Sequence, residues 1–125
     1  DAICGSKPFA TAFRRELAAA LPSHSIERIP PDDPLFTSAF GGYDIRQVTL
    51  RDPESTDGER PLAARTRQVD PQLEGIRLDG RWAVIFSPYD ISCALEDHEA
   101  IGCRGYSRQD AARIGLNVLM YSLNQ

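Results

Sequence analysis

The sequence predicts an α/β protein in which helices flank a layered β-sheet. Three observations support this fold class. Apolar residues recur at helical spacing near each end of the chain, and the segments between them alternate as strands do. The strand at residues 82–86, WAVIF, is apolar throughout, which is typical of a strand covered on both faces. We therefore expect one domain, with this strand in the middle of its sheet.

The length and charge of the chain limit its class. Its 125 residues suit a single domain, and its net charge of −4 is ordinary for a globular protein. The arginines are scattered among acidic residues rather than gathered in one segment, so a nucleic acid is not an expected partner. No segment approaches the roughly 18 consecutive apolar residues of a membrane helix, so the sequence is not expected to span a membrane.

The first helix is predicted over residues 7–22, KPFATAFRRELAAALP. One stripe of apolar residues follows it at every fourth position: Phe9, Phe13, Leu17 and Leu21. Ser6 is placed to cap this helix, and Pro8 falls in its first turn, where the missing N–H has no helical partner to lose. The preceding residues 1–4, DAIC, indicate the end of a strand.

The middle of the chain is predicted to hold short strands and one long excursion. Residues 25–29, SIERI, and 43–50, YDIRQVTL, show strand alternation, and a loop rich in proline and aspartate separates them. Residues 51–71 form the most polar stretch of the sequence. We expect a flexible surface loop there.

A β-hairpin gives the strongest local signal. Residues 73–78 and 81–87 are strand-like, and Asp79-Gly80 between them suits the two positive φ values of a type I′ turn. The closing segment 106–125 is predicted to be a helix that is largely buried, with Ser107 as its N-cap. The order of elements describes half of a doubly wound sheet, so residue 1 is expected to fall inside a larger domain.

Cys4 is a weak candidate nucleophile. It lies between a predicted strand end and a predicted helix start, where a side chain is exposed and the helix N-terminus lowers the pKa of a thiol. A nucleophile elbow has glycines on both sides of its nucleophile, whereas only Gly5 follows here. The alternative is a buried structural cysteine.

The stretch 87–107, SPYDISCALEDHEAIGCRGYS, concentrates Cys93, His98 and Cys103. Their spacing lacks the C-x-x-C element typical of zinc sites, so no metal is predicted. A Cys93–Cys103 disulfide would close a loop of about ten residues and stabilise the fold by about 2–3 kcal/mol. Cys93 is also a weak candidate nucleophile with His98 as its base, and a packed loop with two free thiols is the default alternative.

The turn SPYD supplies the predicted ligand-binding residues Ser87, Tyr89 and Asp90. They follow the apolar strand, and ligands of open α/β sheets bind beyond the carboxyl ends of strands. A carboxylate at Asp90 could bind a ligand or assist a proton transfer. The alternative is that it caps the helix starting in ISCALE.

Several segments together resemble a known family. The order FATAFRREL, PPDDPLFTSAF, LEGIRLDGRWAVIFSPYDISCALE and CRGYSRQDAARIGLNVLMYSL is similar to the domain-of-unknown-function family 4159 of bacterial proteins. The shared motifs are a D-x-P-L-F loop, an L-E-G-I…D-G-R-x-A-V strand pair, an S-x-Y-D turn and a final G-x-N-hydrophobic-hydrophobic-Y helix. The similarity runs over nearly the whole chain.

This resemblance implies a flavodoxin-like fold of the class I glutamine amidotransferase-like superfamily. It implies that residues 1–125 are the C-terminal half of such a domain, without its N-terminal strands. It also implies that residues 81–90 take the place of the strand and His-Pro-Glu motif of true amidotransferases. Ser87 stands at the histidine position, and serine cannot accept a thiol proton at neutral pH as imidazole does. A Cys-His-Glu triad is therefore not expected.

Three functional hypotheses follow. The leading one is a non-glutaminase domain that binds a small ligand or a partner protein at the carboxyl edge of its sheet, with no cofactor. The second is a cysteine-dependent hydrolase or transferase of unknown substrate. The third is a structural or interaction module that packs against a missing N-terminal half or forms a homo-oligomer, and it predicts an exposed apolar patch. The resemblance favours an exported or periplasmic location over the cytoplasm.

Overall fold

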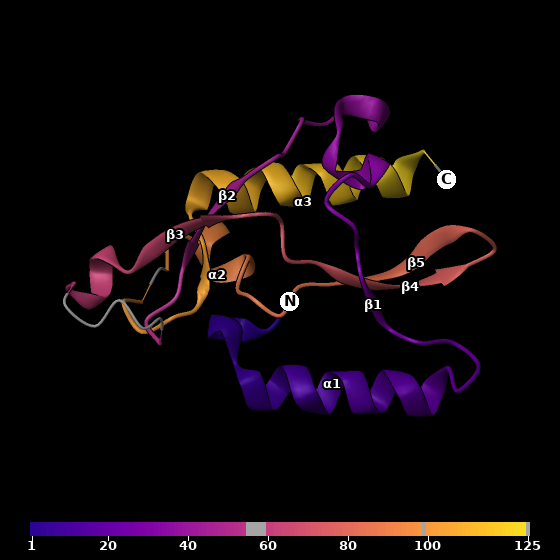
Figure 1. The fold of residues 1–125 in the computed structure, drawn as a ribbon, viewed down its shortest axis with the longest axis horizontal. Helices are drawn as coiled ribbons and strands as arrows, with labels where there is room; N and C mark the ends of the chain where they lie inside the picture. The colour runs from indigo at the N-terminus through magenta and orange to yellow at the C-terminus, as the bar shows by residue number, and fades with distance from the viewer. Residues whose placement is uncertain (55–59, 99, 125) are drawn as a thin grey trace.

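The chain adopts an α/β fold built on two small antiparallel sheets, as a computed structural model describes for residues 1–54, 60–98 and 100–124 (Figure 1). The first sheet has the order β1-β4-β5, with bounds Glu27–Arg28, Glu74–Leu78 and Arg81–Phe86. The second has the order β3-β2-β6, with bounds Thr66–Val69, Val48–Arg51 and Gly105–Tyr106. The helices are α1 at Lys7–Ala20, α2 at Ser92–Leu95 and α3 at Arg108–Leu123. The predicted α/β class is confirmed.

Helices α1 and α3 cover opposite faces of the first sheet (Figure 1). On the α1 face, the rings of Phe13 and Phe86 pack with their centroids 4.5 Å apart. On the α3 face, the hydroxyl of Tyr121 accepts a 2.8 Å hydrogen bond from the backbone N–H of Trp82. The sheet is therefore the middle layer between two helices.

A β-bulge in β5 lets one strand supply apolar side chains to both faces. The register of the β4–β5 ladder shifts so that Ala83 is an extra residue on β5. Because the bulge inverts the alternation, Trp82 packs on the α3 face and Phe86 on the α1 face, although they are four positions apart. This explains why WAVIF has no polar side.

The predicted central position of this strand is wrong for the described sheet. β4 is the central strand, and β5 is at the edge. Covering of the faces and pairing of the edges are independent, so a strand with apolar residues on both faces can still lack a neighbour along one edge. Every ladder in the described ranges is antiparallel, and the parallel pairing there is a single bridge between Asp90 and Gly105.

The local predictions for the hairpin and the helix ends are confirmed. Asp79 and Gly80 have φ values of 51° and 82°, as a type I′ turn requires. The hydroxyl of Ser6 accepts the N–H of Phe9 at the start of α1, and Ser107 caps α3 in the same way.

The prediction of a loop over residues 51–71 is corrected in part. β3 lies within this stretch and pairs with β2 over four residue pairs. β3 is an edge strand of mostly exposed polar residues, so its sequence carries no apolar alternation. Residues 55–59 of the predicted loop lie outside the described residues.

The buried amide of Asn117 makes three of the hydrogen bonds that hold loop 30–44 against α3. Asn117 is buried, and its Oδ1 accepts the N–H of Tyr43 at 2.7 Å while its Nδ2 donates to the carbonyls of Leu35 and Tyr43 at 2.8 Å. In the same loop, Asp33 accepts a 2.9 Å hydrogen bond from the indole N–H of Trp82.

No helix of the described chain is long and apolar enough to cross a membrane.

Candidate ligand-binding cleft

A disulfide joins the start of the chain to the segment after α2, and it corrects the predicted pairing. Cys103 bonds to Cys4, 99 positions away, and Cys93 is the free cysteine. The candidate Cys93–Cys103 bridge is therefore wrong, and the alternative of two free thiols holds for Cys93 but not for Cys103. The chain returns after α2 to lie beside the turn at Ile3–Gly5, where the N–H of Arg104 donates to the carbonyl of Cys4 at 3.1 Å. This long-range return has no local signal in the sequence.

The candidate nucleophiles do not form a catalytic pair in this structure. Cys4 has no thiol, because its sulfur is in the disulfide. The Asp90 carboxylate, hydrogen-bonded to the thiol, raises the pKa of Cys93 above its usual value, which reduces the thiolate fraction that a nucleophile needs. His98 contacts Cys93 through a backbone hydrogen bond, in which the N–H of His98 donates to the carbonyl of Cys93 at 2.8 Å. The side chain of His98 is exposed.

The side chain of Asp90 links the turn after β5 to the turn at Ile3–Gly5 and to α2. It is buried, and its Oδ1 accepts the N–H of Cys4 at 3.0 Å while its Oδ2 accepts the N–H of Ala94 in α2 at 3.3 Å. Asp90 thus accepts one N–H of the first turn of α2, as in the capping alternative, although the N-cap position itself is Ile91. Ser87 is also buried, and its hydroxyl donates to the carbonyl of Tyr89 within the same turn at 2.6 Å.

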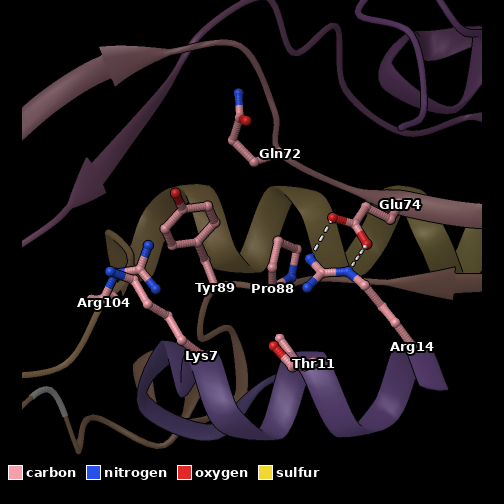
Figure 2. Close-up of a pocket in the computed structure, with 9 residues that line it drawn as sticks. Lys7, Thr11, Arg14, Gln72, Glu74, Pro88, Tyr89 and Arg104 are labelled. Carbon is pink, nitrogen blue, oxygen red and sulfur yellow. Dashed lines mark hydrogen bonds and ion pairs between the residues drawn. The ribbon is translucent and has the colours of Figure 1, made fainter. Parts of the chain in front are cut away.

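A cleft of about 400 Å³ opens between α1 and this turn (Figure 2). It is lined mainly by polar, charged and ring side chains from four segments: Lys7, Ala10, Thr11, Arg14, Gln72, Glu74, Pro88, Tyr89 and Arg104. Lys7, Thr11 and Arg14 are four and three positions apart, so they share one face of α1. Figure 2 shows Arg104, Lys7 and Tyr89 toward one end of the cleft and the Arg14–Glu74 pair at the other.

The Arg14–Glu74 pair closes one end of the cleft. Arg14 donates from Nε and Nη2 to the two carboxylate oxygens of Glu74, at 2.8 and 2.6 Å. This paired contact raises the pKa of the Arg14 guanidinium further above its usual value. The bond links α1 to the first residue of β4, so it also fixes the width of the cleft.

Arg104 is held rigidly at the other end. Its Nε donates to Asp52 at 3.3 Å, and its Nη1 donates to the carbonyl of Gly5 at 3.0 Å. Its guanidinium carbon lies 4.8 Å from the centroid of the Tyr89 ring, a cation–π contact. Tyr89 in turn meets the ring of Tyr106 edge-on at 6.1 Å.

Two close backbone contacts bring Arg104 to this position. A Cβ on Gly105 would lie 2.9 Å from both the Cβ and the carbonyl oxygen of Asp90. A Cβ on Gly5 would lie 2.3 Å from the carbonyl oxygen of Arg104, and Gly5 has a φ of +62°. Only glycine fits at either position, so the two glycines let the three segments meet.

Buried Tyr106 supports the floor beneath the cleft. Its hydroxyl accepts the N–H of Gln72 at 3.1 Å and donates to the carbonyl of the same residue at 3.2 Å. Burial of the ring raises the pKa of this phenol far above its usual value, so the hydroxyl stays protonated. Gln72 is thereby fixed where it lines the cleft.

The described residues contain no group of three or more His, Cys, Asp or Glu side chains arranged to hold a metal ion.

The model of the family described as "Domain of unknown function (DUF4159)" matches residues 1–123. The chain belongs to this family. Among the curated proteins and the solved structures compared with it, none matches.

In this DUF4159 domain, sequence reasoning found one residue of the cleft wall. Tyr89 lines the cleft, whereas Ser87 and Asp90 are buried in the turn behind it. Apart from Ala10 and Pro88, the lining residues that the sequence did not indicate are charged or polar: Lys7, Thr11, Arg14, Gln72, Glu74 and Arg104. For Lys7, Thr11 and Arg14 the sequence does contain a signal, because they form a polar stripe beside the apolar stripe that predicts the helix.

Proposed function

We propose that this DUF4159 domain is a non-glutaminase binding domain that takes a small ligand in the cleft between α1 and the turn at residues 87–90. The observation that carries this proposal is the convergence of charged side chains on an open space of about 400 Å³, beside an aromatic ring already stacked on Arg104. Small-molecule sites are concave and combine apolar surface with a few fixed polar groups.

The arrangement of thiols and imidazoles supports binding rather than cysteine chemistry. The described lining of the cleft contains neither cysteine nor histidine. Cys4 is in a disulfide, and the carboxylate of Asp90 disfavours the Cys93 thiolate. A cysteine hydrolase needs a thiolate and a base within hydrogen-bond reach of each other.

A fragment screen read by NMR tests the binding proposal. Fragments of mixed charge are titrated into ¹⁵N-labelled protein, and we expect shifts at Lys7, Thr11 and Tyr89. Tyr89→Leu should weaken binding, while the matched control Tyr43→Leu should not. Tyr43 also carries an arginine over its ring, Arg113 at 5.4 Å, but it contacts α3 and does not line the cleft. Fragments that shift only residues outside the cleft would contradict the proposal.

A second candidate is that the chain forms part of a larger flavodoxin-like, amidotransferase-like domain, in which a further polypeptide pairs with β5. Two observations support it. The outer edge of β5 has no ladder in the described chain, and the apolar side chains of Leu95, Leu119 and Leu123 are 44%, 52% and 70% exposed. An unpaired strand edge and an exposed apolar face are typical of a surface that another element covers.

Sedimentation velocity distinguishes this candidate from an isolated domain. The exposed face should make the chain associate, and Leu119→Lys with Leu123→Lys should return it to a monomer. Leu62→Lys is the matched control. Leu62 is 45% exposed, but it lies in the short helical turn Leu62–Ala64 and not in α3. A monomeric chain at high concentration would count against self-association through this face. We further propose an exported or periplasmic location, supported by the Cys4–Cys103 disulfide, because disulfides persist in oxidising compartments.

A further inference from the structure

We infer that the ligand of this cleft is a small molecule with an oxyanion head, a carboxylate or a phosphate, bound at the Lys7–Arg104 end beside Tyr89. The inference rests on the proposed function and adds the chemical class of its ligand. It starts from the lining of the cleft, which contains three cationic side chains and one carboxylate, Glu74.

The two ends of the cleft differ in how firmly their cations are neutralised. At one end, Glu74 satisfies Arg14 through two short hydrogen bonds, so that end offers an ion pair with little net charge. At the other end, Lys7 pairs with Glu54, and both side chains are more than half exposed, at 62% and 58%. Exposed ion pairs contribute little, so an incoming anion can replace Glu54 at small expense.

The second cation at this end, Arg104, is already oriented. Its side chain is 15% exposed and is fixed by Asp52, by the Gly5 carbonyl and by the Tyr89 ring. A guanidinium held in one plane loses little freedom when it donates to an oxyanion. Arginine also matches the geometry of carboxylate and phosphate oxygens better than a point charge does.

In the part of the chain that the structure describes, the carboxylates that pair with the cations of this end are fewer than those cations. Asp52 is shared, because Arg67 also reaches its Oδ2 at 3.4 Å. Among the described residues, Lys7, Arg67 and Arg104 therefore pair with Asp52 and Glu54, three cations with two carboxylates. The remaining positive charge favours an anion over a neutral ligand of the same size.

The rest of the cleft wall indicates a polar body behind the oxyanion head. Thr11 offers a hydroxyl one turn after Lys7 on the same face of α1. Gln72 donates its Nε2 to the carbonyl of Asp70 at 2.8 Å, and this fixes its side chain. The Thr11 hydroxyl suits a small organic acid or phosphate ester that carries hydroxyls.

Calorimetry and ¹⁵N NMR with charged and neutral pairs of probes test the inference. The probes are glycerol 3-phosphate against glycerol, and malate against its diamide. We expect both anions to bind and each neutral partner to bind about tenfold more weakly or not at all. Comparing the phosphate with the carboxylate then shows which oxyanion is preferred.

Two variants assign the effect to this end of the cleft. Lys7→Gln changes an exposed side chain, so it should leave the fold intact and weaken anion binding several-fold. Arg104→Gln should weaken it about tenfold or more, while Arg113→Gln, the control over Tyr43, should leave it unchanged. Anion binding that survives both Lys7→Gln and Arg104→Gln would overturn the inference.

The outcomes also separate this inference from the proposed function. Neutral probes that bind in the cleft as tightly as the anions would overturn the oxyanion class and leave the binding domain in place. A failure of every probe, charged or neutral, to shift cleft resonances would contradict both.

Discussion

Loss of the Cys4–Cys103 disulfide is expected to destabilise the protein strongly, because this bond closes nearly the whole chain into a loop. The two cysteines are 99 positions apart. In the chain-entropy model, a loop of that length is worth about 4.7 kcal/mol of unfolding free energy at 25 °C, against about 2–3 kcal/mol for a ten-residue loop. The magnitude therefore distinguishes the observed bridge from a local one.

Urea unfolding followed by circular dichroism measures this effect in oxidised and reduced protein. The experiment uses a Cys93→Ser background, so that the free thiol cannot exchange with the disulfide. Cys93 is the control, and Cys93→Ser alone should change the free energy of unfolding by less than about 1 kcal/mol. A loss of under 2 kcal/mol on reduction would refute the reasoning, and so would peptide mapping of the unsubstituted protein that finds Cys93 bridged.

Three further predictions follow from single contacts. Gly105→Ala should cost about 1–3 kcal/mol in urea unfolding, since its Cβ would lie 2.9 Å from Asp90, and an unchanged midpoint would contradict that contact. The rate at which iodoacetamide alkylates Cys93 should rise with pH only above the usual thiol pKa, because Asp90 raises the pKa of this thiol. Asp90→Asn should move this pH–rate profile to lower pH. A profile that does not move would contradict the role of Asp90. Arg14→Met should cost about 1–2 kcal/mol, and a double-mutant cycle with Glu74→Gln should show coupling; additive losses would mean that the pair contributes nothing.

Features set by neighbouring residues could be predicted from the sequence. The caps at Ser6 and Ser107 and the turn at Asp79-Gly80 depend on contacts within three or four positions, and all three are confirmed. The α/β class also follows from these local elements. In contrast, the apolar pattern of WAVIF predicts covered faces but contains no information about which strands lie at its edges.

The site depends on contacts between distant segments, and the sequence does not encode these locally. Cys103 has Cys93 ten positions away, yet it bonds to Cys4, because the chain after α2 returns to the first turn. The same return brings Arg104 to Tyr89 and α1, which creates the cleft. Tyr89 was predicted only because it follows an apolar strand, a position where ligands of α/β sheets bind.

A crystal structure of the oxidised chain soaked with glycerol 3-phosphate tests the central claim most directly. The proposed function and the inferred ligand class together predict the phosphate at the Lys7–Arg104 end of the cleft, with Arg104 still stacked on Tyr89 and bonded to Asp52. A cleft filled by its own side chains, or a ligand found only against α3 on the other side of the sheet, would contradict it.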